Sequence, residues 1–243
     1  MTSPDEDELH LKDNVHDFNW VPLSLTHVEY PKGDYLGKFL ALISLSPFGI
    51  ISGFIALILF RRDVHTIVFF IGTVCNEMLN LILKNILSEG RPMQRVNYTE
   101  YGMPSGHSQF SWFFATYIIC FVCIRLHHMN NNSTLETVWK TVIVLSCVSF
   151  AVVVSISRIY LQYHTWKQVI CGTIVGIMFG SFWFGLTHVV LTPYFPIIVS
   201  WRISEILLIR DTTLIPNVLW FEYTNARQET RARSRKLVSM KSQ

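Results

Sequence analysis

The chain has 243 residues, half of them hydrophobic, and a formal net charge of +3 at pH 7. So small a charge argues against nucleic acid as a main partner, because nucleic-acid-binding domains are strongly basic. The five cysteines are odd in number and lie inside apolar stretches, so we interpret them as packing residues and not as disulfides or zinc ligands.

Residues 1–34 are polar and acidic, unlike the basic start of a cleavable signal peptide. Long apolar stretches follow at 35–60, 66–87, 109–126, 139–161 and 169–190. Each is close to the roughly 20 residues that a membrane-spanning helix needs. One buried helix of a soluble protein could explain one such stretch but not five. We therefore expect an all-α, polytopic membrane bundle with about five spanning helices, the first serving as an uncleaved anchor.

The segment 191–210 is interrupted by Pro193 and Pro196, and the apolar part after them is too short to span a bilayer. We expect an interfacial or re-entrant helix here. Residues 224–243 form a basic tail. The predicted organisation is thus a polar N-terminal segment (1–34), a membrane domain (35–223) and the tail.

Five spans would place the N-terminus and the loops 88–108 and 158–168 on one side of the membrane. The Arg61–Arg62 turn, the loop 126–138 and the basic tail would share the other side. The excess of positive charge on the second side predicts that it faces the cytoplasm. If 191–210 spans instead, the tail changes sides. Glycosylation sequons at Asn97 and at Asn131 and Asn132 fall on opposite faces, so at most one region is modified.

Two cations stand at the end of the second apolar stretch, in Lys84-Asn-Ile-Leu-Ser-Glu-Gly-Arg91-Pro92. If the helix continues to Pro92, Lys84 and Arg91 lie two turns apart on one face. The alternative is that the two side chains only extend their charged ends to the lipid headgroups, as lysine and arginine often do at the end of a span. Glu77, in mid-stretch, either pairs with one of these cations or bonds to Asn76 and Asn80 within the bundle.

Pro104-Ser105-Gly106-His107 opens the third apolar stretch. Ser105 is a natural helix cap, and Gly106 allows a ligand to approach the backbone. The free amides at a helix start attract anions. An ordinary capping turn with an incidental histidine is the alternative for this motif taken alone.

Ser157-Arg158 and His164 stand at the end of the fourth stretch. An arginine so close to the apolar boundary is costly unless it faces a site or a partner. Gln168, four residues after His164, would lie on the same helical face and reach its ring.

The three motifs, K-x6-R-P, P-S-G-H and S-R-x5-H, resemble in order and spacing those of the type 2 phosphatidate phosphatase superfamily, whose site vanadium haloperoxidases share. The resemblance implies that His164 is the nucleophile, forming a phosphohistidine, and that His107 protonates the leaving oxygen. Lys84, Arg91 and Arg158 would hold the phosphate oxygens, helped by Ser105 and the Gly106 amide. It implies no metal or other cofactor.

Longer stretches narrow this resemblance. Leu25–Tyr30, Tyr101–Phe110, Ser157–Trp166 and Leu214–Tyr223 are similar to the dolichyldiphosphatase family. That family implies hydrolysis of dolichyl diphosphate at the lumenal face of the endoplasmic reticulum membrane, recycling the lipid carrier of protein N-glycosylation. The substrate lipid and the membrane would be the partners. Two alternatives stay open: a phosphatase for phosphatidate, sphingosine phosphate or another polyprenyl diphosphate, and a non-catalytic scaffold or scramblase.

Two features depart from the superfamily pattern. The superfamily has an aspartate four residues after the nucleophile, where this chain has Gln168, which can accept a hydrogen bond from the ring but brings no charge. We expect the missing charge to favour diphosphate substrates over monophosphates. A phosphate leaving group is less basic than an alkoxide and needs less catalytic assistance to depart. The superfamily core also has three helices before the first motif, and only two apolar stretches are visible here.

Overall fold

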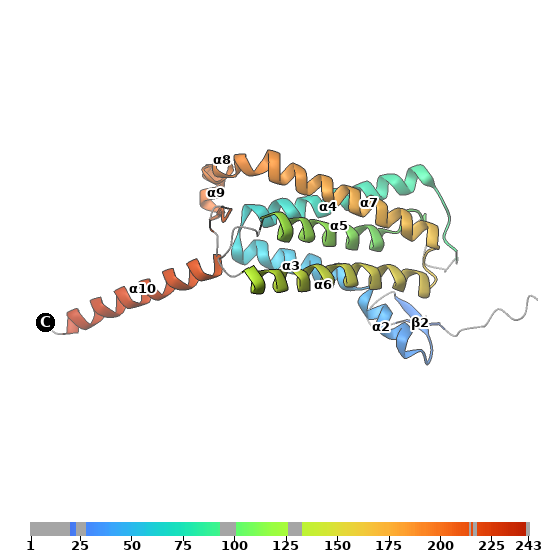
Figure 1. Cartoon of the computed structure of the whole chain (residues 1–243), viewed down its shortest axis with the longest axis horizontal. Helices are drawn as coiled ribbons and strands as arrows, with labels where there is room; N and C mark the ends of the chain where they lie inside the picture. The colour runs from blue at the N-terminus through green and yellow to red at the C-terminus, as the bar shows by residue number, and fades with distance from the viewer. Residues whose placement is uncertain are drawn as a thin grey trace, which may run out of the picture.

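The computed structural model of the chain describes residues 20–22, 28–92, 101–125, 133–213, 215 and 218–241. The sequon asparagines Asn97, Asn131 and Asn132 lie outside these residues. The described chain is a long helical bundle, with the N-terminal elements at one end and a single helix projecting from the other (Figure 1).

Five segments of the described chain are long and apolar enough to cross a membrane: Tyr35–Arg61, Val64–Leu87, Gly106–Arg125, Glu136–Tyr160 and Trp166–Val199. They are formed by α2 (Tyr35–Ile43), α3 (Ser46–Arg61), α4 (Val64–Leu87), α5 (Gly106–Cys120), η1 (Phe121–Arg125), α6 (Ser133–Tyr160), α7 (Trp166–Gly185), η3 (Leu186–Leu191), η4 (Thr192–Tyr194) and α8 (Phe195–Val199). The predicted all-α bundle with five spans is confirmed.

The first segment is broken into two helices. Asp34 caps α2 by accepting the Leu36 N–H at 3.0 Å. The break falls at Ser44 and Leu45, and Pro47 follows in the first turn of α3, where its missing N–H costs nothing. Three helices therefore precede the first motif, although they form only two candidate spans. Ser44, Ser46 and Pro47 mark this break in the sequence, but the apolar residues on both sides made the segment look like one continuous span.

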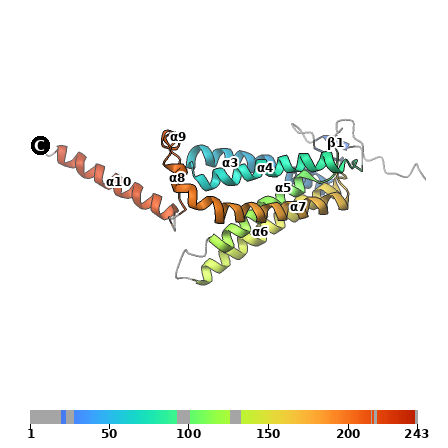
Figure 2. The same cartoon turned by 90° about the horizontal axis from the view of Figure 1, so that it is seen from above.

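Helix α5 lies at the centre, between α4, α6 and α7 (Figures 1 and 2). Its contact with α7 runs along three glycines one turn apart, Gly172, Gly176 and Gly180. A Cβ on Gly172 would lie 2.6 Å from the Ser105 carbonyl oxygen, and one on Gly176 would overlap the Gln109 carbonyl. Small residues let the two backbones approach closely, which is how helices pack in membranes.

A buried amide network joins α4 to α5. The Asn80 Nδ2 group donates to Gln109 Oε1 at 2.8 Å, and Gln109 Nε2 donates to Asn76 Oδ1 at 3.0 Å. All three side chains are fully buried. The two asparagines thus bond to Gln109, while Glu77 lines the cavity described below.

The other end of the bundle is where the chain returns to the turn between α3 and α4. After α8, the short helix α9 (Arg202–Ile206) is followed by a return of the chain to the α3–α4 turn, where the Arg210 N–H donates to the Arg62 carbonyl at 2.9 Å. Glu222 then pairs with Arg61 and Arg210 at 3.2 and 2.9 Å. Residues 191–210 form no separate span. The predicted interruption at Pro193 and Pro196 is wrong, because the fifth candidate span continues through both prolines to Val199. Helix α10 (Val218–Lys241) starts on the Arg61–Arg62 side (Figure 1).

The N-terminal end carries a small antiparallel pair. Strand β1 (Trp20–Pro22) pairs with β2 (Glu29–Pro31), with Val21 opposite Tyr30. This pair leads directly into α2, at the end of the bundle opposite α10 (Figure 1).

Candidate active site

The first motif bends away from its helix. Helix α4 ends at Leu87, and Ser88 closes it in the left-handed conformation (φ 46°) with its N–H on the Lys84 carbonyl. Arg91 therefore lies in the following loop. The expectation that Lys84 and Arg91 share one continuous helix is wrong, because the helix closes three residues before Arg91. The loop is held by the Gly102 N–H, which donates to the Glu89 carbonyl at 2.7 Å.

The second motif starts α5 where predicted. Ser105 occupies the cap position in an extended conformation, but its side chain makes no capping hydrogen bond. Its hydroxyl is buried and has no hydrogen-bond partner among the described residues. Its N–H donates instead to the Gln168 carbonyl at 3.1 Å, which ties the start of α5 to the first turn of α7.

The third motif is a tight turn after α6. Gln162 adopts the left-handed conformation (φ 55°), and the N–H groups of Tyr163 and His164 both donate to the Arg158 carbonyl, at 3.0 and 3.2 Å. The five residues between Arg158 and His164 are the length that this turn uses. The Arg158 and His164 side chains are both buried beside it.

The His164 ring is held in one orientation. Its Nδ1 lies 2.9 Å from the Gly102 carbonyl oxygen and 3.2 Å from Gln168 Oε1. The carbonyl can only accept, so Nδ1 carries the proton and donates. Nε2 is then the unprotonated nitrogen. The predicted contact of Gln168 with the ring is confirmed. The Gly102 carbonyl is a second hydrogen-bond acceptor for the ring, and the motifs did not indicate it.

The His164 imidazole is kept neutral. Burial first, and then the charges of Arg158 and Arg91, lower its pKa from 6.5 to about 3. The hydrogen bonds to Gln168 and Gly102 raise the pKa but do not outweigh burial. A neutral ring with an unprotonated Nε2 is what nucleophilic attack requires.

Gln168 makes contacts on both sides of its amide. Its Nε2 donates to Glu89 Oε1 at 3.0 Å and to the Gly90 carbonyl at 2.8 Å. Its Oε1 also accepts the Thr165 N–H, which completes a capping box at the start of α7. Gln168 thus joins the loop of the first motif to the histidine of the third.

Tyr163 supports Arg158. The guanidinium carbon of Arg158 lies 4.2 Å from the centre of the Tyr163 ring, and the Tyr163 hydroxyl accepts the Glu29 N–H at 2.9 Å. A guanidinium on an aromatic face is held without losing its charge. Strand β2 is in this way anchored beside the site.

One cavity of about 970 Å³ collects the motif residues. Both histidines, the three cations and Gly106 line one part of it. The other side chains that α3 and α4 contribute form a mainly apolar wall, in which only Thr73 and Glu77 are polar. It is lined by Val28, Leu45, Pro47, Phe48, Ile51, Phe70, Thr73, Val74, Glu77, Lys84, Arg91, Gly106, His107, Phe110, Arg158, Tyr163 and His164. A charged head and a hydrocarbon chain would both find matching surfaces here.

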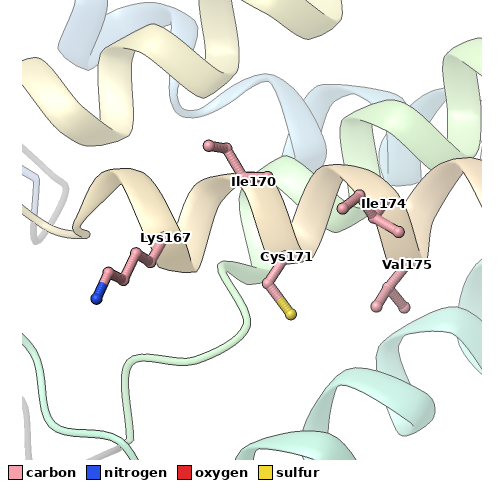
Figure 3. A pocket seen from close by; sticks show the side chains of 5 residues that line it. All are labelled: Lys167, Ile170, Cys171, Ile174 and Val175. Atoms are coloured by element: carbon pink, nitrogen blue, oxygen red, sulfur yellow. The ribbon is translucent and has the colours of Figure 1, made fainter.

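A second, shallower hollow of about 360 Å³ lies on the outer surface of α7 (Figure 3). It is lined by Lys167, Ile170, Cys171, Ile174 and Val175, all from this helix. With one cation and no histidine among its lining residues, it lacks the groups for phosphoryl chemistry.

The sequence profile of the PAP2 superfamily matches residues 65–190, just over half of the chain. The chain belongs to the PAP2 superfamily. Lys84, Arg91, His107, Arg158 and His164 all fall inside the matched region and line one cavity. The resemblance inferred from the three motifs is confirmed.

Several relatives are similar to this chain over most of its length. Dolichyldiphosphatase 1 of Homo sapiens is 51% identical over 222 residues, covering 90% of this chain and 93% of the relative. Lipid phosphate phosphatase gamma of Arabidopsis thaliana is 41% identical over 210 residues, covering 84% and 90%. The narrower resemblance to dolichyldiphosphatases is likewise confirmed.

A solved structure has the same fold. The transmembrane PAP2 type phosphatidylglycerolphosphate phosphatase of Bacillus subtilis superposes with a TM-score of 0.53, covering 64% of this chain and 78% of that one. The two sequences are 20% identical, so this likeness concerns the fold alone.

Proposed function

We propose that this protein hydrolyses dolichyl diphosphate to dolichyl phosphate and inorganic phosphate through a phosphohistidine on His164. One observation carries the proposal: the cavity that holds a neutral, oriented His164 with three cations continues into an apolar wall between α3 and α4. The names of the relatives at about half identity support the choice of lipid.

The reaction has two steps. His164 Nε2 attacks the terminal phosphorus, a P–N bond forms, and the bond from phosphorus to the bridging oxygen breaks. His107 gives a proton to that oxygen, and dolichyl phosphate leaves. Water then attacks the phosphohistidine while His107 takes its proton, the P–N bond breaks, and inorganic phosphate leaves.

The cations act on charge in the transition state. Lys84, Arg91 and Arg158 approach the cavity from three elements and would hold the non-bridging oxygens, with the Gly106 amide at the start of α5. Fixed cations in a site partly closed to water stabilise this charge without having to reorganise. The buried Ser105 hydroxyl has no hydrogen-bond partner among the described residues, and we assign it to donate to a phosphate oxygen.

We place the protein in the endoplasmic reticulum membrane with the cavity facing the lumen. The orientation is supported by the end of the bundle where Arg61, Arg62 and α10 gather, because positive segments stay in the cytoplasm. The choice of membrane rests on the resemblance to the dolichyldiphosphatase family. The predicted division into an N-terminal segment, a membrane domain and a basic tail belongs to the same proposal.

This orientation is tested with an epitope tag after Gln243 in sealed microsomes. Protease added outside should remove the tag, while a lumenal marker stays intact until detergent is added. A tag that survives until detergent is added would reverse the orientation.

The substrate is tested by phosphate release from purified protein in detergent with EDTA present. We expect faster release from dolichyl diphosphate than from phosphatidate or sphingosine phosphate, and none from His164→Ala. Preference for another lipid would keep the chemistry and overturn the substrate. No release from any lipid phosphate by folded protein would favour the non-catalytic scaffold or scramblase.

A further inference from the structure

We propose that Glu89 is a positioning residue for His164, acting through the Gln168 amide, and that it supplies the negative charge missing at position 168. This rests on the proposed function, in which His164 is the nucleophile. The three residues come from the loop after α4, the first turn of α7 and the turn after α6.

The first step is the orientation of the Gln168 amide. One end of the amide faces two acceptors, Glu89 Oε1 at 3.0 Å and the Gly90 carbonyl at 2.8 Å. The other end faces the Thr165 N–H at 3.3 Å and His164 Nδ1 at 3.2 Å. Reversing the amide would place its oxygen against two acceptors, so the Glu89 carboxylate and the Gly90 carbonyl together fix Oε1 toward the histidine.

The second step is the effect on the ring. With Gln168 Oε1 and the Gly102 carbonyl both facing Nδ1, only a protonated Nδ1 is satisfied, and Nε2 keeps its lone pair for phosphorus. When Nε2 becomes phosphorylated while Nδ1 stays protonated, the ring gains positive charge. A carboxylate that polarises the intervening amide stabilises that charge, and the proton stays on Nδ1 throughout.

The surroundings hold this chain of contacts in place. Gln168 is fully buried, and the Gly102 N–H donates to the Glu89 carbonyl at 2.7 Å. A Cβ at Gly102 would lie 2.9 Å from Gln168 Nε2 and 3.0 Å from the Arg91 side chain, so a larger residue there would have to displace these side chains. Glu89 itself is exposed, and water weakens its charge. We therefore expect a moderate contribution.

The test exchanges carboxylate and amide without changing the size of either side chain. Full-length protein is compared as wild type, Glu89→Gln, Gln168→Glu and the double variant, by kcat and KM for phosphate release from dolichyl diphosphate. Glu205→Gln, at the opposite end of the bundle, is the control for loss of one negative charge.

We expect Glu89→Gln to lower kcat about five- to tenfold with KM unchanged. Gln168→Glu should lose at least as much, because two carboxylates then face each other. The double variant should lose less than the product of the two single losses, since the carboxylate now lies directly on the ring and the amide introduced at position 89 donates to it. Recovery should stay incomplete, because a carboxylate oxygen at position 168 then faces the Gly90 carbonyl. Glu205→Gln should match wild type.

The proposal is overturned if Glu89→Gln retains its kcat, if only KM changes, or if the losses of the two single variants multiply in the double variant. Failure of the proposed function looks different: wild type would release no phosphate, or His164→Ala would equal wild type. Should the protein prefer another lipid phosphate, the same ranking measured on that lipid decides the role of Glu89.

Discussion

At the scale of the residue, the proposed chemistry depends on a histidine that stays neutral in a site crowded with cations. Its contact with Gln168 was predicted from their spacing in the sequence, but the contributions of Gly102 and Glu89 were not. The three motifs predicted His107, His164 and their cations, because each carries an unusual residue at a fixed spacing. Gly102 contributes only a backbone carbonyl, and Glu89 reaches Gln168 only because the loop after α4 turns back. Such contacts leave no periodic signal in a sequence.

The low pKa of His164 has a consequence for stability. The folded protein holds the pKa near 3, whereas the unfolded chain has the ordinary 6.5. Below pH 6.5 the unfolded chain therefore binds a proton that the folded protein does not, and stability falls as the pH falls. Between pH 6.5 and 5 this site alone destabilises the fold by an amount on the order of 2 kcal/mol.

His164→Gln should remove this loss of stability at low pH, since a glutamine can still donate to the Gly102 carbonyl but does not titrate. Thermal unfolding in detergent at pH 7 and pH 5 measures it. We expect the midpoint of the wild type to fall more between the two pH values than that of the variant. An equal fall in both proteins would show that His164 is not held neutral by its surroundings.

At the scale of the element, length and hydropathy were sufficient to predict the five spans. They did not predict the break between α2 and α3 or the end of α4 at Leu87, because both depend on local backbone turns within apolar or motif sequence. The glycines of α7 were also missed. Their role depends on which helix lies against them, and that is a property of the fold rather than of the segment.

Gly176→Ala tests this close packing. The added methyl group would overlap the Gln109 carbonyl, so the helices must separate, at a cost of about 1–3 kcal/mol. We expect a lower unfolding temperature and reduced phosphate release, since α5 carries His107. Gly53→Ala is the matched control, because a Cβ there meets nothing within 4 Å. If both variants behave alike, the glycine contact does not hold α5 in place.

At the scale of the whole molecule, the two ends of the bundle carry different sets of charged residues. One end collects the phosphate-handling groups, and the other collects Arg61, Arg210 and Glu222 at the start of α10. This arrangement was predicted from the sequence, because five spans place the three motifs on one side of the membrane and the Arg61–Arg62 turn on the other. The sequence did not predict the apolar wall between α3 and α4, because a cavity arises from how helices diverge and not from any one of them. That wall is what makes a lipid-linked phosphate the fitting substrate.

The central claim is that phosphate passes through His164. Its most direct test is rapid acid-free quenching of the protein during turnover of dolichyl diphosphate labelled in the terminal phosphate, followed by mapping of the labelled residue. The account predicts an acid-labile label on His164 of the wild type and no label in His164→Ala. Phosphate release without any protein-bound label, unchanged in His164→Ala, would contradict it.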